Sequence, residues 1–383
     1  MAEHPFLPYG RQTIDDSDAD TLASAIRHDF LTTGPGVAAF ESDLVDVTTA
    51  PYAVAVSSGT AALHAAYFAA GLGPGDELIT TPLTFAGTAN AARFLGADVS
   101  FVDVRSHDGN IDPEAVASAI TDRTKIVCAV DYAGHPCDYA ALGAICRDAG
   151  VTLIADAAHS LGATLGGRPV GTLADASTFS FHPVKVVTTG EGGAVVTSNQ
   201  ALAERARSFR NHGINRDPET MSHYEGPWYY EISELGLNYR VTDLQCALGR
   251  NQLARLGDFV GRRRAIAARY LAELACDELI LPTIGADVEP AWHLFVVRVT
   301  RPELRRRFFE RLRELRLGVQ VHYVPVHYHP YYRNIRDEVG KFPKAEAYYG
   351  AAVSLPIYPT MTDADVGSVV GRVKQAVDEV LRS

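Results

Sequence analysis

The stretch FSFHPVKVVTTGEGGAVVT, from Phe179 to Thr197, places one lysine between two β-rich runs. Lys185 follows the predicted strand Thr178–Ser180 and precedes the glycine-rich turn Gly190–Gly193, which leads into a second predicted strand, Ala194–Thr197. Lysine is usually a surface residue, so this pattern alone is typical of a solvated turn between strands. The rest of the sequence has to decide between that turn and a lysine with a chemical role.

Short apolar runs alternate with helical stretches up to about residue 250. The run Tyr52–Val56 is followed by a turn and an Ala-rich helical stretch, and the segments beginning ELIT, TKIVCAV and VTLIAD repeat the alternation. Strands that are apolar throughout and separated by helices indicate a parallel sheet that is covered on both faces. The sequence therefore predicts an α/β fold with a mostly parallel sheet.

The C-terminal third has a different pattern. Long helices are expected from Thr242 to Leu274, and AWHLFVVRV, after Pro290, is expected to form a strand. An Arg-rich amphipathic helix (Arg301–Arg316), a strand GVQVHY and a final helix DADVGSVVGRVKQAVDEVL follow. We interpret residues 1–250 as a large domain and residues 251–383 as a smaller α+β domain.

Composition and charge exclude several classes of function. The chain has 383 residues, 47% of them hydrophobic and 21% charged, with a formal net charge of −11. That length suits two domains. Nucleic-acid backbones are bound by an excess of Lys and Arg, so nucleic acid is not expected as a partner. A local cluster of donors still permits an anionic small molecule.

Targeting and redox signals are absent from the sequence. The N-terminus, MAEHPFLPYGRQTIDD, has no cationic region followed by an apolar run, and no apolar run approaches the ~20 residues that span a bilayer. Five cysteines, an odd number without a C-x-x-C pair, make a disulfide framework and a zinc knuckle unfavourable. A cytoplasmic protein without a membrane partner is expected.

A possible phosphate site lies where the strand Tyr52–Val56 ends. Ser57, Ser58, Gly59 and Thr60 form the turn into the Ala-rich helix, and the free N–H groups and dipole of a helix N-terminus suit phosphate. Ser and Thr are also ordinary N-cap residues, so the turn alone is a weak signal. The chain has no G-x-x-x-x-G-K-[ST] and no G-x-G-x-x-G in this turn, which disfavours an NTPase loop and a dinucleotide fold.

A carboxylate stands at the end of the apolar run Leu153–Ala155. Asp156 lies where ligands of open α/β sheets bind, and a buried carboxylate there needs a cation or hydrogen bonds. An aspartate that caps a helix starting at Ala157 is an equal alternative from the residues alone.

Together, these three signals indicate pyridoxal 5′-phosphate (PLP). A lysine such as Lys185 forms the Schiff base, an aspartate such as Asp156 keeps the pyridine nitrogen protonated, and a helix N-terminus holds the phosphate. Phe85 follows TPLT and is placed to stack on the ring, although an aromatic residue there is as often part of the core.

The chain resembles the DegT/DnrJ/EryC1/StrS family of nucleotide-sugar aminotransferases, almost from end to end. SSGTAAL, Asp156–His159, SFHPVKVVTTGEGG and LNYRVTDLQCALG carry the resemblance. It implies a fold type I PLP-dependent transferase, similar to aspartate aminotransferase. GPWYYE (Gly226–Glu231), NHGINRDP and VHYVPVHYHPYYR are similar to the branch that acts in pseudaminic acid biosynthesis. That branch makes UDP-4-amino-4,6-dideoxy-N-acetyl-β-L-altrosamine from a 4-keto sugar.

The resemblance also implies roles for single residues. Lys185 and Asp156 would be catalytic, with Lys185 moving the proton. The cofactor would contact Ser58, Gly59, Thr60, Phe85, Asp156, His159, Ser180 and Lys185, with Asn238 reaching the cofactor phosphate of a partner subunit. The sugar nucleotide would contact Tyr9, Leu31, Thr32, Thr33, Gly34, His322, Tyr323, Val324 and Pro325. L-glutamate as amino donor and a homodimer with shared active sites are further implications.

Other interpretations explain less of the sequence. His322, His327 and His329 have the spacing H-x₄-H-x-H, which matches no common zinc pattern, so no metal is expected. Sugar dehydratases of the same family carry histidine where Lys185 stands. An aminotransferase for a dTDP- or GDP-linked 3- or 4-keto sugar stays open, and a non-catalytic sensor on the same fold would not need the full set Asp156, Ser180 and Lys185.

Overall fold

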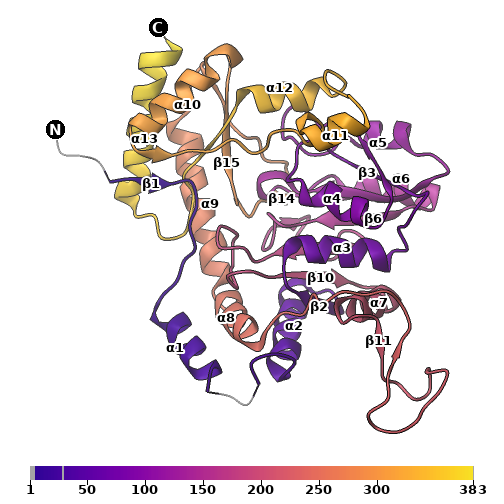
Figure 1. Cartoon of the computed structure of the whole chain (residues 1–383). Coiled ribbons are helices and arrows are strands. Elements are labelled where there is room, and N and C mark those ends of the chain that lie inside the picture. Colours follow the sequence, from indigo (N-terminus) through magenta and orange to yellow (C-terminus); the bar gives the residue numbers. More distant parts are fainter. Residues whose placement is uncertain (1–4, 28–29, 383) are drawn as a thin grey trace.

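A seven-stranded sheet lies at the centre of the computed structural model, which describes residues 5–27 and 30–382 (Figure 1). Residues 1–4, 28–29 and 383 lie outside this description. They include the two ends of the predicted domains and the start of the N-terminal segment in which no signal peptide was predicted. The strand order is β2-β10-β9-β6-β5-β3-β4. The strands are β2 (Tyr52–Val56), β3 (Glu77–Thr80), β4 (Asp98–Phe101), β5 (Thr124–Val130), β6 (Thr152–Asp156), β9 (Ala176–Ser180) and β10 (Gly193–Thr197).

The predicted parallel sheet is confirmed for five of these strands. β4, β3, β5, β6 and β9 pair in parallel, whereas β10 pairs antiparallel with both β9 and β2. Strands β9 and β10 are joined by the segment that contains Lys185, and Gly193 lies opposite Ser180. This pairing places the Lys185 segment at the end of β9, beside the turn that follows β2.

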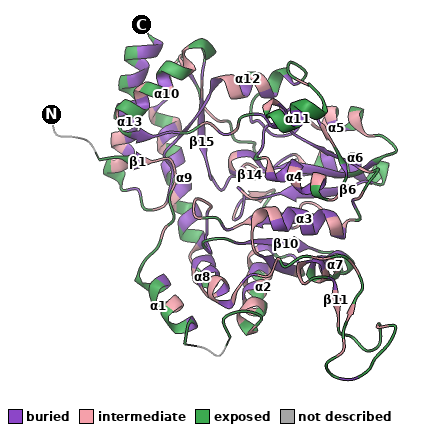
Figure 2. Cartoon of the chain, in the orientation of Figure 1, coloured by how far each residue is buried: buried purple, intermediate pink, exposed green. Residues whose placement is uncertain are grey.

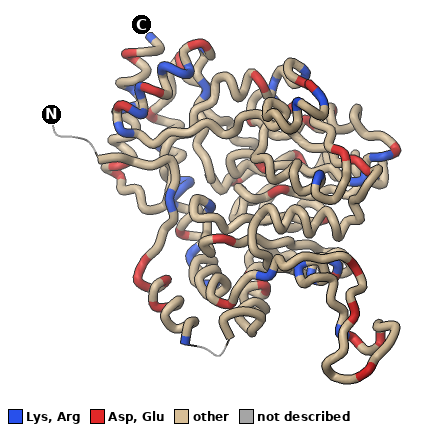
Figure 3. The backbone as a smooth tube through the Cα atoms, in the orientation of Figure 1, with Lys and Arg blue, Asp and Glu red and all other residues tan. Residues whose placement is uncertain are grey.

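Helices cover both faces of the sheet because its strands are apolar on both sides. In β6, Leu153 and Ala155 join one buried cluster and Ile154 joins the other. Helices α3, α4 and α7 pack on the Ile154 side, and α2, α5, α6 and the start of α9 on the opposite side (Figures 1 and 2). The helices before the C-terminal part are α1 (Asp16–Ala25), α2 (Pro35–Thr48), α3 (Gly59–Ala69), α4 (Gly87–Phe94), α5 (Pro113–Ala119), α6 (Tyr139–Ala149) and α7 (Gln200–Arg210). Charged residues lie mostly around this centre rather than within it (Figure 3).

Short strands connect the loops around the sheet. β7 (Thr164–Leu165) and β8 (Arg168–Pro169) form a small sheet with β14 (Val288–Glu289). β11 (Ile214–Asn215) and β12 (Glu231–Ile232) pair antiparallel, and the loop between them extends away from the main body (Figure 1).

The C-terminal part of the chain contains a three-stranded sheet of order β13-β15-β17, whereas its first helix, α8, packs with the core of the large sheet. Its helices are α8 (Asp243–Leu253), α9 (Leu256–Glu273), α10 (Arg305–Glu314), α11 (Pro330–Ile335), α12 (Pro343–Ala351) and α13 (Asp363–Ala376), with a π-helical turn at Val377–Leu381. Its strands are β13 (Leu279–Ile280), β15 (Phe295–Val299), β16 (Leu317–Gly318) and β17 (Ala352–Leu355). Two 3₁₀ turns lie in this part, at Pro302–Leu304 and Val326–Tyr328, and a third follows β5, at Tyr132–Gly134. Among the described residues, no helix combines the length and the apolar character needed to cross a membrane.

Two predicted elements are shorter than expected. The strand in AWHLFVVRV begins only at Phe295. Of the predicted strand GVQVHY (residues 318–323), only Gly318 belongs to a regular strand, and Gln320 adds an isolated bridge to Ser354. After it, the His322 carbonyl accepts a hydrogen bond from the Tyr132 hydroxyl instead of from a neighbouring strand. The chain therefore leaves the sheet here and turns toward the end of β5.

The N-terminal strand β1 (Leu7–Pro8) pairs in parallel with β16. Leu7 belongs to the apolar cluster of the C-terminal part, and the backbone N–H of Ile357 donates to the Tyr9 carbonyl at 3.0 Å. The first residues of the described chain thus pack with its last third, and the division at residue 250 stays a prediction.

Arg263, in α9, connects separate loops through a buried guanidinium. Its side chain is 1% exposed, and Nη1 donates to the carbonyls of Trp292 (3.2 Å) and Ile357 (2.9 Å). Burial lowers the pKa of Arg263 to about 10. Three separate segments of the chain therefore meet at one side chain.

We expect Arg263→Met to lower the free energy of unfolding by about 1–3 kcal/mol, because it leaves buried carbonyl oxygens without donors. The urea midpoint of the purified protein measures the change. Arg306→Met is the matched control, since the Arg306 side chain is 87% exposed and pairs only with Glu310, one turn along the same helix. That control should leave the urea midpoint nearly unchanged, because a solvent-exposed ion pair contributes little to stability. Equal midpoints for both variants would contradict the role of Arg263.

Candidate active site

A cavity of about 620 Å³ lies at the carboxyl ends of β6 and β9. It brings together eleven of the residues that the sequence singled out: Tyr9, Ser58, Gly59, Thr60, Phe85, Asp156, His159, Ser180, Lys185, His322 and Tyr323. They come from the sheet, from the N-terminal segment and from the C-terminal part. Segments from these three parts of the chain therefore line the cavity together, and the sheet alone does not form it.

The turn after β2 forms one end of the cavity. Ser58 is the N-cap of α3, and its Oγ accepts from the N–H of Ala61 at 3.1 Å. The ordinary N-cap interpretation is thus correct, but the same turn also lines the cavity. Gly59 is required by close packing, since a Cβ at this position would lie 2.7 Å from the Ser180 Cβ. The free N–H groups at the start of α3 suit an anion such as a phosphate.

Asp156 is buried at the end of β6. Its Oδ2 accepts from the Thr88 hydroxyl at 2.7 Å, and its Oδ1 accepts from the N–H of Ala158 at 3.3 Å. No helix begins at Ala157, so the interpretation as a helix cap is wrong. Burial raises the pKa of Asp156, whereas the hydrogen bonds and the nearby Lys185 act to lower it.

Thr88 is a site residue that the sequence analysis missed. It lies in α4, lines the cavity and also contacts the hydroxyl of Thr84 at 2.9 Å. The available signal was the spacing of these two threonines, which places both hydroxyls on one face of a helical turn. Phe85, between them, is 64% exposed at the cavity wall, and its stacking on a ring stays a prediction.

Lys185 lies in the turn after β9, where its backbone N–H donates to the His182 carbonyl at 2.9 Å. The side chain is partly buried, and within the described chain its amine makes no hydrogen bond or salt bridge. Burial lowers the pKa of Lys185 to about 8, against the opposing attraction of Asp156. The amine therefore loses its proton at lower pH than an exposed lysine does.

Three buried histidines line one wall of the cavity. His159 comes from the part with the large sheet, and His293 and His322 come from the C-terminal part. The rings of His159 and His293 lie 4.3 Å apart, and the Tyr323 hydroxyl lies 2.9 Å from His159 Nε2. His322 Nδ1 lies 2.8 Å from the Ser354 hydroxyl. Burial lowers the pKa of each histidine, that of His322 to about 4, and Lys185 lowers all three further. They are neutral at pH 7.

His293 was missed by the sequence analysis because it lies inside a segment expected to be a strand. The ring of His293 reaches His159 because its loop packs against Gly134. A side chain at position 134 would place its Cβ 3.0 Å from the His293 backbone nitrogen. No local pattern predicts such a contact between distant segments.

The histidines considered for a metal have other partners. His327 Nε2 lies 3.0 Å from Glu346 Oε1, and His322 pairs with Ser354. Within residues 5–27 and 30–382, no group of three metal-binding side chains was found.

The remaining predicted residues lie outside this cavity. Leu31 is exposed, Thr32 forms an isolated bridge with Thr242, and Asn238 forms one with Asn211. Thr33 and Gly34 line a second cavity of about 760 Å³ between α2 and α7. Val324 and Pro325 follow Tyr323 in the chain but do not line the first cavity.

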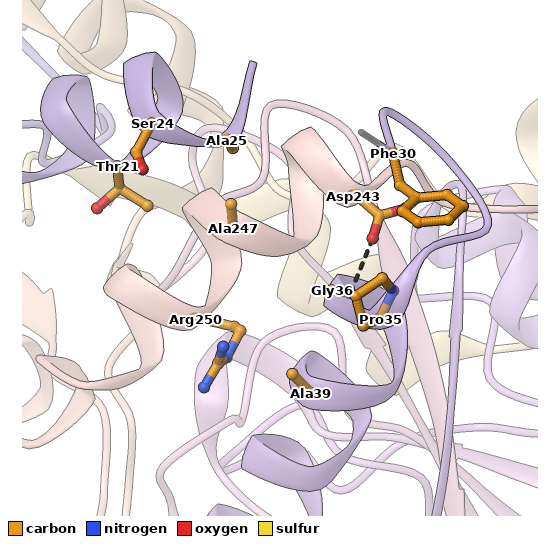
Figure 4. Close-up of a pocket in the computed structure, with 10 residues that line it drawn as sticks. All are labelled: Thr21, Ser24, Ala25, Phe30, Pro35, Gly36, Ala39, Asp243, Ala247 and Arg250. Carbon is orange, nitrogen blue, oxygen red and sulfur yellow. Dashed lines mark hydrogen bonds between the residues drawn. The ribbon is translucent and has the colours of Figure 1, made fainter. Parts of the chain in front are cut away.

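Helix α2 also borders a third cavity, of about 580 Å³, on its side toward α1 and α8 (Figure 4). There the carboxylate of Asp243 accepts from the N–H groups of Gly34 and Gly36, each at 2.8 Å. Asp243 thereby fixes the start of α2, and with it the position of the predicted sugar-nucleotide segment.

The first cavity fits PLP. Asp156 is a buried carboxylate at one end, and Lys185 supplies an amine without a hydrogen-bond partner among the described residues. The start of α3, kept open by Gly59, supplies N–H groups and the hydroxyls of Ser58 and Thr60. These are the groups that the pyridine nitrogen, the aldehyde and the phosphate of PLP require.

Comparisons with known proteins support the same interpretation. The model of the "DegT/DnrJ/EryC1/StrS aminotransferase family" matches residues 12–374. The chain is 39% identical to the spore coat polysaccharide biosynthesis protein SpsC of Bacillus subtilis (strain 168), over 378 residues and 97% of each chain.

Solved structures are similar over nearly the whole chain. The putative sugar aminotransferase Spr1654 of Streptococcus pneumoniae, in its PMP form, has a TM-score of 0.92, with 28% identity and 99% of each chain covered. It was also solved in a PLP form. PseC of Helicobacter pylori, an aminotransferase involved in the biosynthesis of pseudoaminic acid, has a TM-score of 0.92 and 27% identity, covering 98% of this chain and 100% of PseC. These neighbours confirm the predicted fold type I class.

We expect the purified protein to be yellow, with a visible band that borohydride removes and a reduced PLP adduct on Lys185. The four other lysines of the sequence are Lys125, Lys341, Lys344 and Lys374, all exposed, and serve as internal controls in peptide mass spectrometry. Lys185→Ala should abolish the band, because no other amine lines the cavity in the described chain. Lys344→Ala, which removes only a surface pair with Asp112, should keep it. An adduct on another lysine would contradict the assignment.

Proposed function

Because this chain belongs to the DegT/DnrJ/EryC1/StrS aminotransferase family, we propose that it transfers an amino group from L-glutamate to a 4-keto-6-deoxy nucleotide sugar. The proposed substrate is a UDP-linked N-acetylhexosamine, and the product is its 4-amino derivative. The coarser activity, that of a PLP-dependent sugar aminotransferase, follows from the family. The observation that carries the proposal is that Lys185, Asp156 and the start of α3 line one cavity.

The residues of the cavity would divide the chemistry among them. When bound, PLP supplies an aldehyde that combines with amines and a conjugated ring that delocalises an electron pair. Lys185 Nζ would hold the cofactor and, with its pKa lowered to about 8, accept and return a proton near neutral pH. Asp156 would hold positive charge at the pyridine nitrogen. Ser58, Thr60 and Ser180 would bind the phosphate.

The neutral histidines would leave Lys185 as the group that exchanges protons. Burial holds the pKa values of His159, His293 and His322 below their usual range, so these rings disfavour the second proton that would give them a positive charge. The Tyr323 hydroxyl, 2.9 Å from His159 Nε2, would fix the orientation of that ring beside the cofactor.

The choice of sugar rests on similarity to PseC and on the segments GPWYYE, NHGINRDP and VHYVPVHYHPYYR. Tyr9, His322 and Tyr323 line the cavity that would receive the sugar. Transfer at C4, the UDP moiety and glutamate as donor are all parts of this proposal.

We propose a homodimer with shared active sites. Asn238 is exposed and does not line the cavity of its own chain. It is therefore free to contact the cofactor phosphate in the cavity of a partner subunit. Large apolar side chains are also exposed around the β11–β12 loop, a feature that is common at protein interfaces: Tyr224, Trp228, Tyr230, Ile232 and Leu235. A cytoplasmic location stays a prediction from the sequence.

Asp156→Asn should keep PLP bound but lower turnover by about 100-fold or more, because an amide cannot stabilise a pyridinium as a carboxylate does. Absorbance measures bound cofactor, and the rate of glutamate-dependent amination measures turnover. Thr88→Val is the matched variant, since it removes one hydrogen bond to Asp156 and leaves the charge. It should lose less activity than Asp156→Asn. Near-normal turnover of Asp156→Asn would remove the residue from this role.

The substrate is tested with a panel of UDP-, dTDP- and GDP-linked 3- and 4-keto sugars, each with and without glutamate. We expect the highest kcat/KM for the UDP-linked N-acetylated 4-keto sugar, with one equivalent of 2-oxoglutarate formed per amino sugar. Preference for a 3-keto sugar, or deoxygenated product instead of amination, would contradict the proposal.

A further inference from the structure

His322 directs one ring nitrogen to the protein and leaves the other for the Lys185 cavity. Its side chain lines the cavity, and Nδ1 lies 2.8 Å from the Ser354 hydroxyl. Nε2 has no hydrogen-bond partner within the described residues. Unlike Nδ1 of His159 and of His293, which are enclosed by the protein without a partner, this nitrogen is not enclosed. Nε2 is therefore the nitrogen of His322 that a ligand in the cavity can reach.

Ser354 lies in β17, behind this wall of the cavity. It is completely buried and does not line the cavity itself. Its backbone N–H donates to the Gln320 carbonyl at 2.8 Å, and the N–H of Gln320 donates to the Ser354 carbonyl at 3.3 Å. These two bonds fix Ser354 beside the segment that leads into His322.

The backbone and the ring of His322 are also held from other sides. The Tyr132 hydroxyl donates to the His322 carbonyl. The ring centres of Tyr9 and Tyr323 lie 5.1 Å and 4.9 Å from that of His322. With the position of the ring fixed in this way, the property that remains to be set is which of its nitrogens carries the proton.

The surroundings of Ser354 decide where that proton lies. Burial, with the nearby Lys185, lowers the pKa of His322 to about 4, so the ring is neutral at pH 7 and has one donor and one acceptor nitrogen. The Ser354 hydroxyl has no other acceptor within the described chain. A proton on Nδ1 would therefore leave a buried hydroxyl proton without an acceptor, which costs free energy. When the hydroxyl donates to Nδ1, the ring proton is on Nε2.

We propose that Ser354 is a positioning residue that keeps His322 in the form protonated at Nε2, so that this wall donates a hydrogen bond to a carbonyl oxygen of the keto sugar. The inference rests on the proposed function and adds to it the group that recognises the carbonyl. A carbonyl oxygen only accepts hydrogen bonds, so the other form of His322 would oppose it with a lone pair. A neutral donor between two aromatic rings suits an uncharged sugar, whereas the carboxylates of glutamate bind most strongly to charged donors.

The first test measures the position of the proton directly. In the PLP-loaded protein with ¹⁵N-labelled histidines, nitrogen chemical shifts distinguish a protonated ring nitrogen from an unprotonated one. His322→Gln identifies the signals of His322 by their loss. We expect the proton on Nε2 in the wild type at neutral pH, and a larger share of the Nδ1 form in Ser354→Ala. A proton on Nδ1 in the wild type, or the same distribution in both proteins, would overturn the proposal.

The second test is the rate of amination at varied keto-sugar concentration. Ser354→Ala should raise KM by about 3- to 10-fold and change kcat by less than about twofold, because one neutral hydrogen bond to the bound sugar is weakened. Ser354→Cys keeps the size of the side chain but has a weaker donor, so its KM should fall between those of Ser354→Ala and the wild type.

Ser177→Ala is the matched control. Ser177 lies in β9 and is also completely buried, but its hydroxyl has no hydrogen-bond partner within the described residues. Its removal should change KM by less than about twofold, since no hydrogen bond is lost. An equal rise of KM in Ser177→Ala, or an unchanged KM in Ser354→Ala, would contradict the role of Ser354.

The reaction with glutamate alone separates positioning of His322 from a general change of the cavity. The spectral change of bound PLP should reach half its maximum at the same glutamate concentration in Ser354→Ala as in the wild type. Equal weakening for both substrates would overturn the proposal. If the wild type reacts with glutamate but aminates no keto sugar, the proposed function fails together with the sugar contact, whereas the nitrogen shifts still decide whether Ser354 sets the form of His322.

Discussion

The burial of one acid and one base in the same cavity is the constraint on which the site depends. Loss of water disfavours both charged forms, so it raises the pKa of Asp156 and lowers that of Lys185, while their mutual attraction opposes each shift. Thr88 and the N–H of Ala158 supply the hydrogen bonds that a buried carboxylate requires. Burial lowers the pKa of the surrounding histidines, so they add no positive charge to the interaction between Asp156 and Lys185.

The shape of that cavity depends on how the C-terminal part docks. His293 and Tyr323 reach the end of β6 only because their loops are held against the sheet, and Arg263 fixes one of these loops through the carbonyls of Trp292 and His293. A single buried guanidinium thus contributes to stability and positions a wall of the site. The same interaction explains why the cavity cannot be assigned to the large sheet alone.

One fold can host many functions, so function has to be argued from the residues of the site. Asp156 is the last residue of β6, and Ser58 and Lys185 follow the ends of β2 and β9. Thr33 and Gly34 lie in the connecting segment that leads into α2. The groups expected to hold PLP are therefore positioned by the sheet, whereas the residues proposed to contact the sugar nucleotide lie partly in connecting segments.

The local sequence was sufficient for the alternation of strands and helices, for the strand Tyr52–Val56 and for the cluster of Ser58, Asp156, Ser180 and Lys185. Apolar periodicity and turn residues act over a few positions, and parallel strands bring their carboxyl ends to one edge. The tertiary structure decided that Asp156 caps no helix and that GVQVHY leaves its sheet at His322. It also decided that Thr88 and His293 join the site, because these outcomes depend on hydrogen bonds and packing between segments far apart in the chain.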